Sequence, residues 1–70
     1  MEISNEEQTR AMLAAWENLA TPAQKKEISL AIQQLELNFM YYEQKGSSQG
    51  VARCERCIRL LSERLATLSV

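Results

Sequence analysis

"ISLAIQQLELNFMYYEQKGSSQGVARCERCIRLLSERLATL", residues 28–68, contains two amphipathic stretches separated by the polar sequence KGSSQG. In each stretch the apolar residues recur three and four positions apart, which is the spacing of one face of an α-helix. The two glycines of KGSSQG favour a turn. The pattern predicts an antiparallel helical hairpin with helices over about 22–44 and 49–68. We expect the hairpin core to contain Ile28, Ile32, Leu35, Phe39, Tyr42, Val51, Cys54, Ile58, Leu61, Leu65 and Leu68.

A shorter helix, over about 5–20, is predicted to precede the hairpin. Ser4 and Glu7 have the spacing of a capping box, in which each side chain accepts the backbone N–H of the other residue. Apolar residues at helical spacing then follow, namely Met12, Ala15, Trp16 and Leu19. No segment has the pattern of a strand, so the predicted fold class is all-α, in a single small domain of residues 1–70.

The boundaries between these helices are predicted from capping residues. Thr21 is a suitable N-cap, Pro22 fits the first helical position, and Gln24 completes a second capping box. Because the residue before a proline disfavours the helical conformation, the first helix should end near Leu19 or Ala20. Either serine of KGSSQG is expected to cap the last helix.

The helix over 22–44 is apolar on two sides. At 100° per residue, Leu30, Leu37 and Tyr41 lie opposite the predicted core residues, and Met40 lies between the two sides. Leu60 similarly points away from the core side of its own helix. A helix of this kind usually packs between two others. Either the helix over 5–20 covers the second side with Trp16, or part of that side binds a partner protein. The predicted partner-binding residues are Leu30, Leu37, Met40, Tyr41 and Leu60.

The size of the chain favours the second possibility. A core of about 70 residues seldom supplies more than about 3–5 kcal/mol, and the chain has two cysteines and no histidine with which to add disulfides or a metal. A partner subunit or a second copy of the chain is the remaining support. No apolar run approaches the roughly 20 residues that span a bilayer. The acidic start MEISNEEQTR lacks the features of a secretory signal, so we expect a cytoplasmic protein.

Charge is distributed unevenly along the chain. Residues 1–20 are acidic and residues 51–70 are basic, with a net charge of −1 overall. Nucleic-acid binding normally needs a denser basic patch than four arginines interleaved with two glutamates. A solvated, salt-bridged helix face is the favoured interpretation of these arginines, and we expect no nucleic-acid partner.

Cys54 and Cys57 stand one helical turn apart. They form half of a zinc site at most, unless two copies pool four thiolates, and they do not follow a strand as a redox motif would. We interpret them as small, reduced, buried residues. With no histidine and no nucleophile–base pair, we expect neither catalysis nor a cofactor.

From Ile28 to Leu65 the chain resembles the needle co-chaperones of bacterial type III secretion systems. The resemblance is carried by IQQLELNFMYYEQKGSSQGVARCERCIRLLSERL, in which a helix containing QQLE leads through a glycine-containing turn into a second amphipathic helix. It implies a protein without catalytic residues that pairs with a helical-repeat chaperone and, through it, keeps the needle subunit unpolymerised. A homodimeric helical regulator of phage or plasmid type, which modulates a host protein, is the alternative. A weak nucleic-acid binder is a third possibility.

Overall fold

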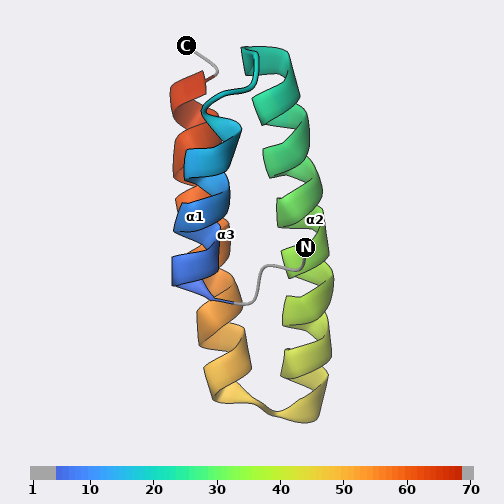
Figure 1. Cartoon of the computed structure of the whole chain (residues 1–70). Helices are drawn as coiled ribbons and strands as arrows, with labels where there is room; N and C mark the ends of the chain where they lie inside the picture. Colours follow the sequence, from blue (N-terminus) through green and yellow to red (C-terminus); the bar gives the residue numbers. More distant parts are fainter. Residues whose placement is uncertain (1–4, 69–70) are drawn as a thin grey trace.

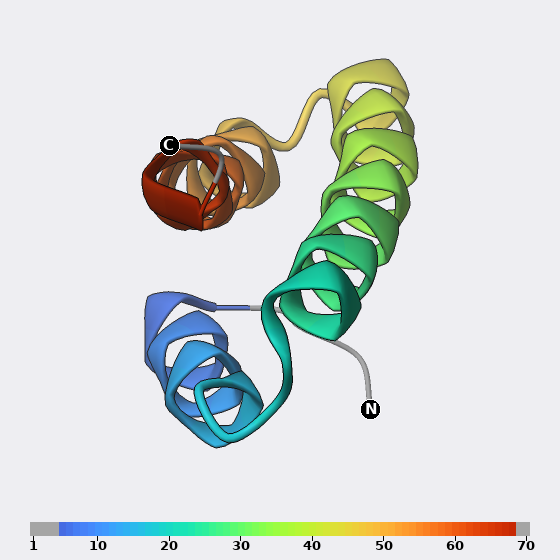
Figure 2. The same ribbon diagram turned by 90° about the horizontal axis from the view of Figure 1, so that it is seen from above.

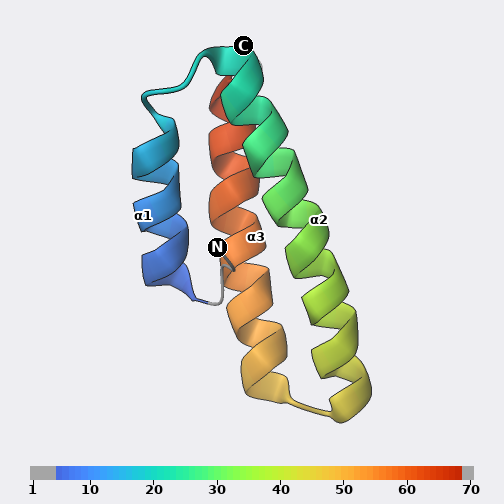
Figure 3. The ribbon, with the colours of Figure 1, turned by 45° about the vertical axis from the view of Figure 1, so that its right-hand side comes forward.

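A computed structural model describes residues 5–68 of the chain. These residues form three helices and no strand, in the order α1 (Glu6–Trp16), α2 (Thr21–Lys45) and α3 (Ser48–Leu68). α2 and α3 run antiparallel beside each other, and α1 lies along α3 (Figures 1 and 3). The molecule is elongated and measures 38 × 19 × 17 Å. The predicted all-α class and the helical hairpin with a short preceding helix are confirmed.

The start of α1 differs from the predicted capping box. Asn5 occupies the N-cap position in an extended conformation, and its side-chain oxygen accepts the backbone N–H of Gln8 at 2.8 Å. Ser4 lies outside the described residues. Glu6 and Glu7 occupy the first turn, where negative charge is favourable at the positive end of the helix dipole. The helix therefore begins one residue later than a Ser4 cap would require.

α1 also ends earlier than predicted, at Trp16 instead of near Leu19 or Ala20. The backbone N–H of Leu19 bonds to the carbonyl of Trp16 at 2.9 Å, which tightens the chain into a turn. Ala20 is the N-cap residue of α2 and Thr21 is its first helical residue, so the predicted Thr21 cap is wrong. The side-chain amide of Gln24 donates to the Leu19 carbonyl at 2.8 Å. This bond holds the turn together in place of the capping box.

The turn between α2 and α3 contains the glycine turn and the serine cap that the sequence predicts. Gly46 adopts φ = 74°, the left-handed conformation that closes many helices, and its N–H bonds to the carbonyl of Glu43. The N–H of Ser47 bonds to the carbonyl of Tyr42 at 3.0 Å, which completes a Schellman motif. Ser47 then caps α3, because its hydroxyl accepts the N–H of Gly50 at 3.2 Å. The expectation of a serine cap is confirmed.

α3 is the central helix, because it packs against both α2 and α1. The buried core consists of Leu13 from α1, Ile28 and Leu35 from α2, and Cys54, Cys57 and Leu61 from α3. Most of the other predicted core residues are partly buried against this cluster, namely Ile32, Phe39, Tyr42, Ile58, Leu65 and Leu68. Val51 is half-buried. The core is small for a folded chain, as its length predicts.

α1 contacts α3 through a different side than the sequence pattern indicated. Thr9 and Leu13 are its buried residues, whereas Ala15 and Leu19 of the predicted stripe are exposed. The Thr9 hydroxyl, although fully buried, donates to the Asn5 carbonyl at 2.9 Å and so stays satisfied. Trp16 and Met12 are partly buried against the core cluster.

Ion pairs accompany this contact between the acidic α1 and the basic α3. Glu6 contacts Arg56 at 2.8 Å as well as Arg10 of its own helix at 3.3 Å, and Glu17 contacts Arg64 at 3.5 Å. Pairs this exposed contribute at most about 1 kcal/mol each, but they orient α1 on α3. For Arg56 and Arg64 the structure thus confirms a salt-bridged helix face.

Candidate protein-binding surface

α2 carries an apolar surface that no other helix covers. We define the outer face as Leu30, Leu37, Met40 and Tyr41. These residues are exposed by 51–62%. A group of large exposed apolar residues is informative about binding in a way that a single one is not. Seen from above, α1 and α3 both lie on one side of α2, and its other side faces no helix of the described chain (Figure 2). The outer face is therefore a candidate binding surface.

Helix α1 does not cover the outer face, because it packs on α3 instead. Trp16, which would cover that face in the alternative of a self-contained fold, contributes instead to the core cluster from α1. Leu60 is half-buried against the same cluster and lines a hollow between α1 and α3 together with Leu13. Leu60 is thus separated from the other four predicted partner-binding residues, which the structure places together on α2.

Tyr41 is held in place by its neighbours on the same helix. Its ring packs edge-to-face against the Tyr42 ring, with centroids 5.5 Å apart, and the ammonium of Lys45 lies 5.6 Å from the Tyr41 centroid. Both arrangements are favourable aromatic interactions. An aromatic ring that is already oriented loses less conformational entropy when a partner binds it.

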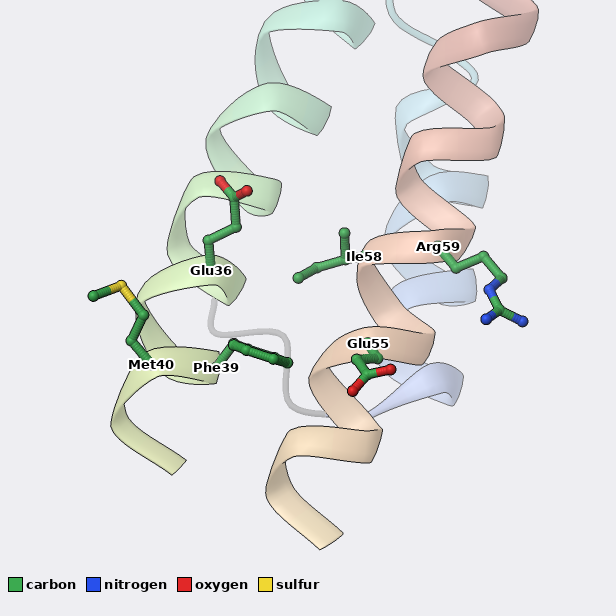
Figure 4. Close-up of a pocket in the computed structure, with 6 residues that line it drawn as sticks. All are labelled: Glu36, Phe39, Met40, Glu55, Ile58 and Arg59. Carbon is green, nitrogen blue, oxygen red and sulfur yellow. The ribbon is translucent and has the colours of Figure 1, made fainter. Parts of the chain in front are cut away.

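A groove between α2 and α3 adjoins the outer face at Met40. It encloses about 520 Å³ and is lined by Glu36, Phe39, Met40, Glu55, Ile58 and Arg59. Phe39 and Ile58 point toward each other from the two helices and form its apolar floor (Figure 4). The sequence pattern placed both residues in the hairpin core, and their partial exposure at the groove was not predicted. The sequence did contain a signal for this exposure, because one glutamate stands near the apolar residues of each helix, Glu36 on α2 and Glu55 on α3.

The cysteine pair lies in the core. Cys54 and Cys57 are free and buried, at 4% and 0% exposure. Within residues 5–68 no three histidine, cysteine, aspartate or glutamate side chains are grouped so as to hold a metal ion. Burial raises the pKa of the Cys54 thiol above its ordinary value of 9.0, and the neighbouring Cys57 raises it further, against a smaller opposite effect of Arg53.

This raised pKa predicts a loss of stability at alkaline pH. Above about pH 9 the thiol of Cys54 ionises in the unfolded chain but stays protonated in the folded chain, so its contribution to the free energy of unfolding falls as pH rises. Urea unfolding between about pH 8 and pH 10 should show a steeper decline for the native sequence than for Cys54→Ala. Parallel declines in the two proteins would contradict the prediction.

None of the helices within residues 5–68 combines the length and apolar character that crossing a membrane requires. No protein-family model, curated protein or solved structure matches the chain significantly.

Proposed function

We propose that this protein is a non-enzymatic helical adaptor that binds a larger helical partner protein through the outer face of α2. The supporting observation is the exposure of Leu30, Leu37, Met40 and Tyr41 on α2. By helical periodicity Leu30, Leu37 and Tyr41 fall opposite the buried side of this helix. The resemblance to type III secretion co-chaperones suggests a helical-repeat chaperone as the partner, and a needle subunit kept unpolymerised as the purpose of the complex. Action in the cytoplasm follows from the same resemblance.

The energetics of the outer face support a specific complex. Full burial of one large apolar side chain contributes about 1.5–3 kcal/mol, and about half of that remains to be gained by each of these side chains. The four residues together offer apolar surface for a partner to bury, and Tyr41 is of a residue type enriched among the side chains that dominate protein interfaces. The partner would at the same time extend the small core of this chain.

Leu37 is the most exposed of the four, and its replacement gives the sharpest test. Leu37→Glu should weaken partner binding by at least about 100-fold, because a carboxylate would be buried in an apolar interface. Helical circular dichroism should be unchanged, because the side chain adds little to the internal core. Ala11→Glu, at an exposed position of α1, is the matched control and should bind normally. Unfolding of Leu37→Glu would contradict the assignment of this face to binding.

The partner itself is tested by co-expression with the helical-repeat chaperone of a type III secretion system from the same host. Size-exclusion chromatography with light scattering should give a one-to-one complex that Leu37→Glu abolishes. A stable monomer that forms no complex would refute the proposal. A two-chain particle of this protein alone, dissociated by Leu37→Glu, would instead establish the homodimeric regulator.

A further inference from the structure

The groove between α2 and α3 is chemically distinct from the outer face. Its floor is apolar, since Phe39 and Ile58 meet there and are only partly buried (Figure 4). Met40 forms the edge that it shares with the outer face. Grooves between paired helices are common docking sites for a third, amphipathic helix.

The rim of this groove is negatively charged. Glu36 stands on α2 and Glu55 on α3, and both are exposed. Neither carboxylate forms an ion pair within residues 5–68, in contrast to Glu6 and Glu17, which are both paired with arginines. The guanidinium of Arg59 extends away from Phe39 and Met40 (Figure 4). With two glutamates and one arginine among its lining residues, the groove combines an apolar floor with a net negative charge.

The contact between α1 and α3 illustrates how such a groove is filled. There an acidic helix docks on a basic one, with Leu13 buried between them and the ion pairs of Glu6 and Glu17 at the periphery. The α2–α3 groove also places charged side chains around an apolar contact, but its net charge is negative, whereas the side of α3 that faces α1 is positively charged. Complementarity therefore calls for a helix with apolar residues on one side and lysine or arginine along its flanks.

A second copy of the chain fits the groove poorly. A two-fold symmetric pairing through this surface brings the same patch of both chains together, so that two copies of Glu36 and of Glu55 share one interface. The α1 helix of another copy is itself acidic. Like charges in an interface cost binding energy, and the basic helix α3 of another copy already buries its apolar side in its own core. A different, basic protein segment is left as the occupant.

We propose that the α2–α3 groove is a second binding site, which takes a basic amphipathic helix of a partner protein. The apolar residues of the partner helix pack on Phe39 and Ile58, and the lysine or arginine side chains of that helix pair with Glu36 and Glu55. This site shares Met40 with the outer face but does not use Leu30, Leu37 or Tyr41.

Two synthetic peptides test the site. Both carry leucine on one face of a helix, and their flanks carry lysine in one peptide and glutamate in the other. We expect saturable binding of the lysine peptide only, measured by fluorescence anisotropy, with NMR shifts concentrated at Phe39 and Ile58. Binding should weaken with added salt.

Amino-acid substitutions test whether the lysine peptide binds in the α2–α3 groove. The double variant Glu36→Gln, Glu55→Gln should weaken lysine-peptide binding by about tenfold. Glu7→Gln with Glu63→Gln removes the same charge from exposed positions outside the groove and should leave affinity unchanged. The Leu37→Glu variant should also bind the lysine peptide, so that failure of the outer-face proposal and failure of the groove proposal can be told apart.

Several outcomes would overturn the proposal. These are equal binding of the two peptides, no saturable binding, shifts centred on Leu30 and Leu37, or equal weakening by the control pair. Concentration-dependent dimers that the groove variants dissociate would assign the groove to a second copy of the chain instead.

Discussion

Gly50→Ala is expected to destabilise the protein by about 1–3 kcal/mol, although alanine normally stabilises a helix relative to glycine by about 0.5–1 kcal/mol. Gly50 lies in the first turn of α3, and a Cβ atom there would stand 2.5 Å from Cγ and Cδ1 of Tyr42. Because Cγ is the ring atom closest to the backbone, the ring cannot escape by moving its tip. It has to leave the position in which it packs against the hairpin core. Urea unfolding followed by circular dichroism measures the effect.

Two further variants separate this clash from other effects of removing a glycine. Gly46→Ala introduces a Cβ with no neighbour within 4 Å, so its cost reflects only the left-handed backbone, about 1–2 kcal/mol. Tyr42→Ala removes the ring, and in that background Gly50→Ala should become neutral or stabilising. A cost of Gly50→Ala that persists without the Tyr42 ring would contradict the close approach of α2 and α3.

Leu61→Ala is expected to remove most of the stability of the protein. Leu61 is fully buried on the central helix α3, and truncation of a buried leucine costs about 2–5 kcal/mol, including the cavity left behind. A core of this size seldom supplies more than about 3–5 kcal/mol in total. The variant should therefore lose its cooperative thermal transition or melt far below the native protein, as monitored by far-ultraviolet circular dichroism.

Leu37→Ala is the matched control for Leu61→Ala, since the same atoms are removed from an exposed site of α2. Its free energy of unfolding should lie within about 0.5 kcal/mol of the native value. Equal destabilisation by the two substitutions would show that the outer face is buried in the folded particle, as in a self-associated form.

The hairpin could be predicted from the sequence because its determinants are local. Spacings of three and four residues define the facing sides of α2 and α3, and a glycine after Lys45 ends α2 in the conformation that glycine adopts most easily. The outer face followed from the same angular argument, since Leu30, Leu37 and Tyr41 fall opposite the core. The structure leaves these residues uncovered, while their role in binding is a proposal.

The position of α1 could not be predicted from local patterns. Its apolar residues indicated a stripe through Met12 and Trp16, but the buried side is centred on Leu13 and Thr9. In this orientation Leu13 is buried and Glu6 and Glu17 pair with arginines about 50 residues away, and periodicity within α1 does not encode these long-range contacts. The acidic start and basic end of the chain were the available signal.

Capping and register account for the remaining differences. Ser4 and Asn5 are adjacent and are both good caps, so their chemistry alone does not decide between them. The sequence pattern indicated only that Gly50 favours a turn. Its close approach to the Tyr42 ring could not be predicted, because it depends on the register of α2 against α3. Register is a tertiary property, and it also determines that Phe39 and Ile58 form a groove.

The docking of α1 on α3 has a consequence for any ligand of the arginines. α1 is joined to the hairpin by the short linker of residues 17–20, so it competes for α3 as a tethered ligand with an effective concentration in the millimolar range. A nucleic acid or an acidic peptide would have to displace Glu6 from Arg56 and Glu17 from Arg64 before it reached that surface. α1 thus occupies Arg56 and Arg64, while the outer face of α2 and the α2–α3 groove stay exposed.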